Sequence, residues 1–378
     1  MRAGTAFILA LGLLLFALVP WTSAADPIRI GLQGPITGPW ALEGEMAVNS
    51  VQIAVEEINP RGGLLGRPVE LVIGDDMGLA DGAEAVAQRF IAENVVAVIG
   101  SYGSTPTEHA SRLYEEAGIL NIAYGATAVR LTERGYRYFF RTASRDDKLG
   151  EYFGELVRSH LGKSRVAIVH DNSAFSRGLA EAARASLEGA PGVEIVFYDA
   201  IAPGENDYSA DIARMSARTP DVVYFTAYYP EAGVFVRQMR EAGLDTLFVG
   251  GNGAVNAEFI AIAGPAAARE ALMTNEPLPA DLSSPEAEAF LTEYVARHDE
   301  PPSSPWPVYA ADALNVIAAA IAATGSTDSD ILADYLRTIL SIEGITGPIA
   351  FDVAGDRKGA NFKTYVVDED GQFVDAGY

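Results

Sequence analysis

The chain has 378 residues, no cysteine, and 51 Asp and Glu against 27 Lys and Arg, which gives a formal net charge of −24 at pH 7. A surface of this charge repels phosphate backbones and anionic lipids, so we expect no nucleic-acid partner and no peripheral membrane binding. The absence of cysteine excludes disulfides, zinc–thiolate sites, thiol nucleophiles and an N-terminal lipid anchor on cysteine. With only four histidines in the chain, we expect no metal site and no cofactor.

The first 25 residues have the pattern of a secretory signal peptide. Arg2 gives a positive start, an apolar run extends over 6–19, and small residues follow at 22–25. The run is shorter than the ~20 residues that a membrane-spanning helix needs. We therefore expect cleavage near Ala24 or Ala25 and a mature protein in the periplasm without a lipid anchor. No other stretch is expected to approach transmembrane length.

Short β-rich runs alternate with helix-length amphipathic runs through most of the mature chain. The predicted strands cover 28–32, 69–74, 95–99, 120–123, 138–142, 165–170, 194–198, 222–226 and 247–249. The predicted helices include 46–58, 83–93, 107–116, 149–160, 177–187 and 231–242. This alternation is typical of βαβ units and predicts parallel sheets covered by helices on both faces. Because one open sheet rarely holds so many strands, we expect an α/β protein with two doubly wound parallel sheets in two lobes.

The pattern changes after about residue 273. Three helices are predicted at 285–297, 309–323 and 331–340, and strands follow at 348–352 and 362–367. Asp370 and Gly371 then form a hairpin-type turn before a last strand at 372–375. Such a tail cannot form a compact domain of its own, so we expect it to complete the two earlier lobes.

A candidate anion site follows the strand predicted at 95–99. Residues 105–108 have the sequence of a capping box with proline at the first helical position. The free backbone N–H groups of the helix start and the Ser104 hydroxyl can bind a carboxylate. Every turn from a strand into a helix needs a cap, so the same residues also suit a purely structural role.

A second turn of this kind follows the strand predicted at 120–123. Gly125 and Ala126 let a ligand approach the backbone, and Thr127 offers both an N–H and a hydroxyl. Neighbouring strand ends of a doubly wound sheet face one crevice, where ligands bind. The two turns together favour a binding site for a small anionic group.

Aromatic residues follow several of the predicted strands. Trp40, Phe175 and Tyr228 each lie just beyond a strand end, which is the pocket side of such sheets. One aromatic residue in this position is more often a packing residue than a ligand contact. Their repeated placement favours apolar walls for the crevice.

The motifs of common enzyme classes are missing. Gly162, Lys163 and Ser164 resemble the end of a phosphate loop, but Val157 replaces the required glycine, and the order is helix to strand. There is no GxGxxG dinucleotide motif and no GxSxG nucleophile motif. We expect a binding protein rather than an enzyme, and a secreted hydrolase is the enzyme alternative.

A collinear series of segments carries a resemblance to a known family. The segments are IGLQGPITGP at 30–39, INPRGGLLGRPVEL at 58–71, VIGSYGSTPT at 98–107, GILNIAYGATAVRLTERGY at 118–136, FFRTASRDD at 139–147, VAIVHDNSAFSRGLA at 166–180, YYPEAGVFVRQMREAGL at 228–244 and GPIAFDVAGDRKG at 347–359. Together they resemble the leucine/isoleucine/valine-binding type of periplasmic substrate-binding protein, which serves ABC importers. The resemblance covers nearly the whole mature chain.

The resemblance implies a type I periplasmic binding fold, in which two α/β lobes are joined by a three-crossing hinge and trap the ligand between them. The implied N-terminal lobe comprises residues 26–143 and 277–354, and the C-terminal lobe comprises 144–276 and 355–378. The crossings would fall near 142–146, 275–277 and 353–355. The helices of the tail would complete the first lobe and its final strands the second.

The resemblance also implies how a ligand is held. Its carboxylate would bind Ser104 and Thr127 with their backbone N–H groups. An ammonium would bind the carbonyl of Gly125, the hydroxyl of Thr127 and an acidic side chain of the far lobe. Tyr228 matches a tyrosine that closes over the ligand, and Phe175 lies where another tyrosine is usual.

Three residues depart from the family pattern. Asn252 stands where the far-lobe acid is expected, Glu43 where branched-chain binders carry a tyrosine, and Tyr102 where they carry a smaller aliphatic residue. A buried ammonium without a countercharge is strongly unfavourable. Either Glu43 takes over the ammonium, or the ligand is an aromatic or aliphatic carboxylate without an amine. Both hypotheses stay open at this point.

The expected function is that of the extracytoplasmic solute-binding component of an ABC importer. It would capture a small carboxylate, an amino acid or a close relative, by hinge closure and deliver it to a membrane permease with its ATPase. A ligand-sensing receptor of the same fold is the other alternative, and we expect a monomer. The predicted ligand-binding residues are Glu43, Tyr102, Ser104, Gly125, Ala126, Thr127, Phe175, Tyr228 and Asn252.

Overall fold

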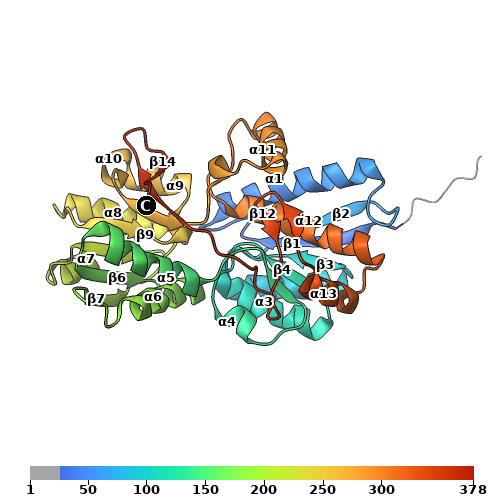
Figure 1. The fold of residues 1–378 in the computed structure, drawn as a ribbon, viewed down its shortest axis with the longest axis horizontal. Helices are drawn as coiled ribbons and strands as arrows, with labels where there is room; N and C mark the ends of the chain where they lie inside the picture. The colour runs from blue at the N-terminus through green and yellow to red at the C-terminus, as the bar shows by residue number, and fades with distance from the viewer. Residues whose placement is uncertain (1–25) are drawn as a thin grey trace, which may run out of the picture.

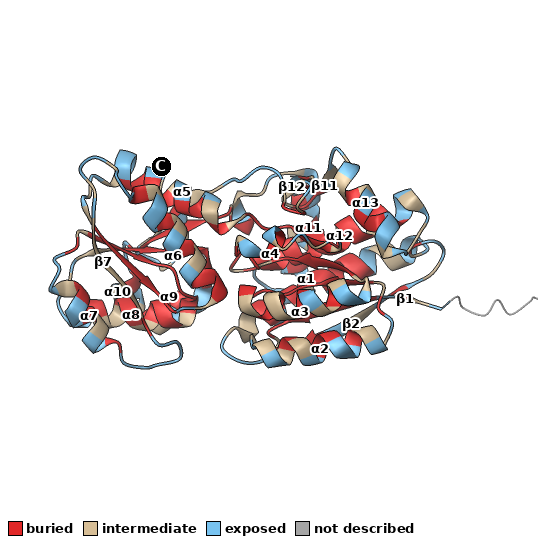
Figure 2. Cartoon of the chain, turned by 90° about the horizontal axis from the view of Figure 1, so that it is seen from below, coloured by how far each residue is buried: buried red, intermediate tan, exposed pale blue. Residues whose placement is uncertain are grey.

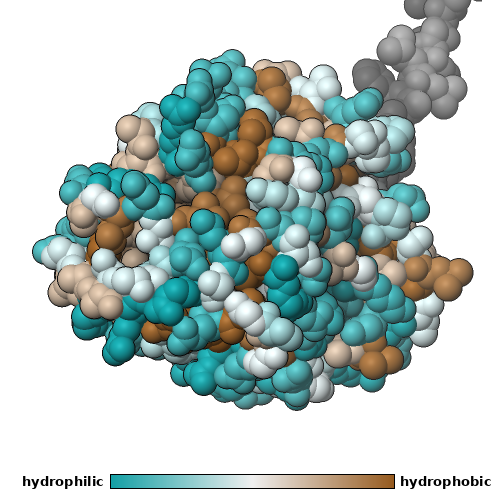
Figure 3. Space-filling model, turned by 60° about the vertical axis from the view of Figure 1, so that its left-hand side comes forward, coloured by the Kyte–Doolittle hydropathy of each residue, from teal (hydrophilic) through white to brown (hydrophobic). Residues whose placement is uncertain are grey.

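The computed structural model describes residues 26–378, and the predicted signal peptide at 1–25 lies outside the described residues. Two lobes lie side by side, each built around a central sheet with helices on its faces (Figure 1). Buried residues fill the sheets and the inward faces of the helices (Figure 2). Hydrophilic residues cover most of the face shown in Figure 3, as the strongly acidic composition predicts.

The first sheet has five parallel strands in the order β2-β1-β3-β4-β5. Its strands are β1 (Ile28–Gly34), β2 (Val69–Asp75), β3 (Ala97–Ile99), β4 (Leu120–Ala123) and β5 (Phe139–Arg141). The strand order reverses between β1 and β3, and ligands of open α/β sheets bind at the carboxyl ends of strands beside such a reversal. Both predicted turns, after β3 and after β4, lie at this end of the sheet.

The helices around the first sheet come from both ends of the chain. They are α1 (Ala41–Ile58), α2 (Ala80–Ala92), α3 (Ser104–Ala117), α4 (Arg130–Glu133), α11 (Pro285–His298), α12 (Trp306–Thr324) and α13 (Ser329–Thr338). Helix α12 packs along α1 and against β3 and β4, so the tail helices complete this lobe. A short hairpin of β11 (Ile342–Gly344) and β12 (Gly347–Ile349) follows α13.

Helix α12 corrects one expectation. Among the described residues it is the one helix long and apolar enough to cross a membrane by length and composition, so a second stretch does approach transmembrane length. Most of its residues are buried inside the lobe. The sheet and its neighbouring helices cover it from several sides, so it needs no polar face.

The second sheet has seven strands in the order β14-β13-β10-β9-β8-β6-β7. The strands that pair in parallel are β6 (Arg165–His170), β7 (Glu194–Ala200), β8 (Val222–Phe225), β9 (Leu247–Gly250) and β10 (Leu272–Asn275). Strand β13 (Lys363–Val367) pairs antiparallel with both β10 and β14 (Phe373–Asp375). Its helices are α5 (Asp146–Leu156), α6 (Ala174–Leu187), α7 (Ser209–Ser216), α8 (Tyr229–Glu241), α9 (Ala257–Ala263) and α10 (Pro265–Ala268). The returning tail therefore adds a hairpin to one edge of this sheet, and the antiparallel pairing is confined to that edge.

The chain passes between the two sheets three times, between β5 and α5, between β10 and α11, and between β12 and β13. The three-crossing hinge is therefore present. Its first and third passages are bonded together. Arg141 N donates to Gly355 O (3.1 Å), and the Arg141 guanidinium pairs with Asp356 (Nε–Oδ1 2.5 Å). Arg145 binds the other oxygen of Asp356 (3.0 Å), so one buried carboxylate holds two arginines at the hinge.

The two lobes contact each other across the cleft. Tyr229 Oη donates to Pro39 O (2.9 Å), and Asn256 Nδ2 donates to Glu43 Oε1 (2.6 Å). The rings of Trp40 and Tyr228 lie 4.0 Å apart between centroids. Each of these contacts joins a residue beside the first sheet to one beside the second, so the lobes are closed on each other.

Candidate ligand-binding site between the lobes

A small cavity of about 170 Å³ lies where the lobes meet. Its walls are formed by Tyr102, Gly125, Thr127, Phe175, Tyr228, Asn252, Gly253 and Trp306. Six of the nine residues that the sequence predicted are in this wall. Both lobes contribute to its walls, as expected of a site that closes around a small ligand.

Aromatic rings from both lobes surround the cavity. The Tyr228 ring lies 5.0 Å from Phe175 and 5.9 Å from Tyr102, measured between centroids. The Tyr102 ring in turn lies 6.2 Å from Trp306. Trp306 was not predicted, because it opens α12 after a proline-rich loop and no strand end marks it. These rings give the cavity a largely apolar lining.

The turn after β3 differs from the predicted capping box. Helix α3 begins at Ser104, its N-cap residue is Gly103, and no side chain caps it. Thr105 Oγ1 instead accepts a hydrogen bond from Ala174 N of the other lobe (3.1 Å). The capping-box prediction was therefore wrong, because the helix starts earlier, after Gly103, which has no side chain to cap the first N–H groups.

Ser104 lies behind the cavity wall rather than in it. Its hydroxyl accepts a hydrogen bond from Ala128 N (3.2 Å), which joins the two turns. Its backbone N–H hydrogen-bonds the phenol of Tyr228 and lowers the pKa of that group, although burial is the larger effect and raises it. A ligand carboxylate at the start of α3 would therefore compete with the Tyr228 hydroxyl for this N–H.

The turn after β4 lies against the cavity. A Cβ atom on Gly125 would stand 2.7 Å from the Tyr102 ring, so only glycine fits at this position. Thr127 Oγ1 is buried and makes no well-formed hydrogen bond with the described residues, although it lies near enough to the Asp146 carboxyl to lower the pKa of that group. Ala126 is buried but does not line the cavity, and its carbonyl accepts from the hinge residue Arg141 (3.2 Å).

Glu43 also lies outside the cavity wall. It is fully buried, and its two oxygens accept hydrogen bonds from Asn256 Nδ2 (2.6 Å) and Ser304 Oγ (2.7 Å). Burial raises the pKa of Glu43 from 4.5 to about 7. Because both carboxylate oxygens already have donors, the structure gives Glu43 a contact between the lobes, and its role as ammonium partner stays a prediction.

Replacing Glu43 with glutamine should flatten the dependence of stability on pH. Because the folded-state pKa of Glu43 is raised, its stabilising contribution is full below about pH 4.5 and is lost as the pH rises towards 7. Between pH 5 and 7 the melting temperature of the wild type should fall more than that of Glu43→Gln. Exposed Glu45 on the same helix provides the control, and Glu45→Gln should keep the wild-type slope.

The same variant tests the ammonium hypothesis. If Glu43 were the countercharge, Glu43→Gln would weaken amino-acid binding by about 30-fold or more. Isothermal titration at pH 8 measures this. An unchanged affinity would leave Glu43 as an interlobe contact only.

Two buried carboxyl groups that the sequence analysis did not select lie beside the cavity wall. Asp146 opens α5, and neither of its oxygens has a hydrogen-bond partner among residues 26–378. Glu276 follows β10, and one of its oxygens, Oε1, is likewise without a partner. Burial raises the pKa of each group to about 7.

Both carboxyl groups adjoin residues of the wall. Asp146 N donates to Thr127 O (3.1 Å), and the Thr127 hydroxyl lowers the pKa of the Asp146 carboxyl, against the larger effect of burial. Asn252 Nδ2 donates to Glu276 Oε2 (3.1 Å). Asp146 lies at the end of the first hinge passage, where α5 begins, and Glu276 lies in the second passage. No hydrophobic periodicity marks either position, so the local sequence does not predict that these carboxyl groups are buried. A motif alone therefore could not find them.

The arrangement complements a molecule with a carboxylate at one point and a cation at another. N–H groups at the start of α3 and the Thr127 hydroxyl provide donors, and Asp146 and Glu276 provide negative charge. No basic side chain lines the cavity. No three His, Asp or Glu side chains in the described part of the chain are grouped to hold a metal ion.

Comparisons with known proteins agree with this architecture. The family described as "Periplasmic binding protein" matches residues 27–372. The "Leucine-, isoleucine-, valine-, threonine-, and alanine-binding protein" of Pseudomonas aeruginosa is 34% identical over 345 residues, which is 91% of each chain.

Two solved structures share the fold over most of both chains. The crystal structure of the leucine-binding protein LivK from Thermotoga maritima has a TM-score of 0.86 at 27% identity and covers 93% of this chain and 98% of its own. That of LivJ from Streptococcus pneumoniae in complex with isoleucine has a TM-score of 0.84 at 28% identity, over 93% and 100%. Since the family match spans nearly all the described residues and both lobes, the chain belongs to the periplasmic binding protein family.

Proposed function

We propose that this protein is the extracytoplasmic substrate-binding component of an ABC importer and that its ligand is an α-amino acid. The observation that carries the proposal is that the Thr127 hydroxyl and the Asp146 carboxyl lie near each other, both buried beside one small cavity, and that neither makes a well-formed hydrogen bond with the described residues. A zwitterion supplies the missing partners of both, since its carboxylate needs donors and its ammonium needs negative charge. The amino-acid ligands in the names of the similar proteins support this reading.

The walls of the cavity indicate the kind of side chain that the ligand carries. The rings of Tyr102, Phe175, Tyr228 and Trp306 leave an apolar space of small volume. An apolar amino-acid side chain gains free energy by leaving water for such a space. We therefore propose a neutral amino acid with an aliphatic or small aromatic side chain.

Closure of the lobes is the proposed mechanism. A ligand that contacts Thr127 of one lobe and Asn252 of the other binds the closed form better than the open one and so shifts the population towards it. The lobes would comprise residues 26–143 with 277–354 and residues 144–276 with 355–378. No bond is made or broken in this cycle, so we propose a binding protein and not an enzyme.

The proposed partners are a membrane permease and its ATPase, which would recognise the surface that the closed lobes form together. The protein would act in the periplasm as a monomer without a lipid anchor, after cleavage near Ala24 or Ala25. A ligand-sensing receptor of the same fold would bind the same ligand but would not stimulate ATP hydrolysis by a permease–ATPase complex in vesicles. Stimulation by the liganded protein therefore separates the two roles.

A thermal-shift panel on the mature protein, from Asp26 onward, tests the ligand class. Each amino acid is paired with the matching carboxylic acid that lacks the amine. A ligand at 100 times its Kd stabilises the folded protein by about 2.7 kcal/mol, which raises the melting temperature measurably. We expect shifts with neutral amino acids only. If only the amine-free acids raised the melting temperature, the protein would be a carboxylate-binding protein and not an amino-acid-binding protein.

A further inference from the structure

We propose that Asn252 and Glu276 together form the acceptor for the ligand's amine, in place of a single acidic residue at position 252, and so make the site select amino acids over acids without an amine. This inference rests on the proposed amino-acid ligand and names the residues that would recognise its amine. Asp146 would supply negative charge from the hinge side, and the Asn252–Glu276 pair from the wall of the second lobe.

The orientation of the Asn252 amide is the first argument. Its Nδ2 donates to Glu276 Oε2 (3.1 Å), so the donor end of the amide is used inside the protein. Its Oδ1 is buried and has no hydrogen-bond partner among the described residues. Asn252 is 1% exposed and lines the cavity. The end left for a ligand is therefore an acceptor, which suits an N–H donor and not a carboxylate.

The charge behind the amide is the second argument. Glu276 is fully buried, and Oε1 has no partner. No lysine or arginine side chain of residues 26–378 forms an ion pair with Glu276 or Asp146, whereas the nearby Arg141 is paired with Asp356. A buried carboxylate with a structural role normally has donors for both oxygens, as Glu43 does. A buried carboxylate oxygen without a hydrogen-bond partner beside a ligand cavity is complementary to an N–H donor such as an ammonium.

The charge of Glu276 also fixes which end of the amide faces the ligand. An ionised Glu276 accepts from Nδ2 and leaves Oδ1 for the ligand. A protonated Glu276 can donate to Oδ1 instead, which would turn the NH₂ group towards the cavity. Burial raises the pKa of Glu276 to about 7, so the preference for an amine should increase from pH 6 to pH 8.

Other charged or titratable groups lie near Glu276 and interact with its charge. They are Asp146 on α5, Arg357 on the third hinge passage, Tyr224 on β8 and Tyr309 on α12. Burial raises the pKa of both tyrosines, whereas the pKa of Asp146 is raised to about 7, so Asp146 titrates in the same pH range as Glu276. A comparison of variants, rather than one pH profile, therefore isolates the effect of Glu276.

The experiment measures the dissociation constants of L-leucine and of 4-methylpentanoate, which is leucine without its amine, by isothermal titration at pH 6 and pH 8. If the thermal-shift panel finds a tighter-binding amino acid, that amino acid and its amine-free acid are the probes. The amine preference is the ratio of the dissociation constant of the acid to that of the amino acid. We expect this ratio at pH 8 to fall about tenfold or more in Glu276→Gln and in Asn252→Leu.

A double variant and a control distinguish this role from a structural one. Glu276→Gln combined with Asn252→Asp places the charge at position 252 itself, with the new amide at 276 as its donor, and should restore the preference. Glu231→Gln removes a buried carboxyl of the same lobe that lines no part of the cavity, and it should leave the ratio unchanged. The rise of the ratio from pH 6 to pH 8 should be smaller in Glu276→Gln than in the wild type.

Three results would overturn the inference in distinguishable ways. An equal weakening of both probes in Glu276→Gln would show that Glu276 only supports the wall, and the proposed function would stand. A double variant with no restored preference would contradict the shared acceptor. A wild type that binds only the amine-free acids, or neither class, would overturn the amino-acid function together with this inference.

Discussion

Replacing Asp146 with asparagine should weaken amino-acid binding by about 30-fold or more, which corresponds to a loss of about 2–5 kcal/mol. Asp146 is fully buried beside Thr127, and its carboxylate has no hydrogen-bond partner among the described residues. The variant would leave the ligand's ammonium in the cleft without this charge. Because burial raises the pKa of Asp146 to about 7, the wild type should also bind amino acids more tightly at pH 8 than at pH 6. Isothermal titration at both pH values measures the two effects.

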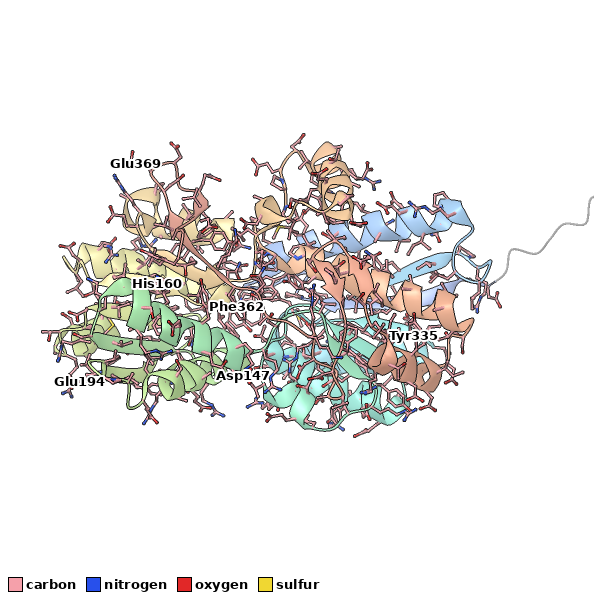
Figure 4. The ribbon with its side chains drawn as sticks, in the orientation of Figure 1. Asp147, His160, Glu194, Tyr335, Phe362 and Glu369 are labelled. Atoms are coloured by element: carbon pink, nitrogen blue, oxygen red, sulfur yellow. The ribbon has the colours of Figure 1, made fainter. Side chains whose placement is uncertain are left out.

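The neighbouring residue provides a matched control for this prediction. Asp147 lies at the junction of the two lobes (Figure 4), where its partly exposed side chain pairs with Arg145 (2.9 Å). Asp147→Asn removes the same charge one residue away and should change the affinity by less than about threefold, because pairs with partial exposure contribute little. Equal losses in the two variants would show a general electrostatic effect and would contradict a direct role of Asp146. Amine-free acids should bind Asp146→Asn at least as well as the wild type.

Replacing Asp356 with asparagine should lower the free energy of unfolding by about 3–5 kcal/mol. The carboxylate of Asp356 receives Arg141 Nε (2.5 Å), Arg145 Nη1 (3.0 Å) and Thr132 Oγ1 (2.9 Å) at the hinge. Arg141 is fully buried, so the variant leaves a buried guanidinium without its countercharge. Denaturation in urea, followed by circular dichroism, measures the change.

A surface partner of the same arginine gives the control. Glu133 also pairs with Arg145 (3.4 Å), but its side chain is 60% exposed. Glu133→Gln should lower the unfolding free energy by no more than about 1 kcal/mol. If Asp356→Asn had as small an effect as Glu133→Gln, the buried network would not stabilise the hinge. Since the network joins two of the three hinge passages, Asp356→Asn should also alter the equilibrium between open and closed lobes.

Individual strands show how far the sequence can predict this fold. Strands β4 (Leu120–Ala123) and β6 (Arg165–His170) begin and end where the sequence analysis placed them. Both are short β-rich runs in a βαβ context, buried at nearly every position, and such runs are the clearest strand signal. Strand β10 was not predicted. It lies where the alternation of strands and helices ends, and it pairs with β9 on one side and with the distant β13 on the other.

The candidate site likewise contains residues that the sequence predicted and residues whose roles only the packed structure shows. Rules about strand ends and helix starts led to Gly125 and Thr127, which do line the cavity. The capping box was wrong because Thr105 bonds across the cleft to Ala174, a contact that exists only when both lobes are folded. Glu43 was expected at the ligand and instead binds Asn256 and Ser304, residues more than 200 positions away.

The sequence by itself predicted the two-lobed α/β architecture and the two turns that face the cleft, because periodicity and turn residues are local properties of the chain. The three-crossing hinge was expected from the family resemblance and not from any local pattern. Only the tertiary structure decided which charges the cleft holds. Asp146 and Glu276 are buried because segments far apart in the chain exclude water from them, and both keep carboxylate oxygens without a hydrogen-bond partner among residues 26–378. Burial and pairing depend on the whole packed molecule, so no single segment encodes them.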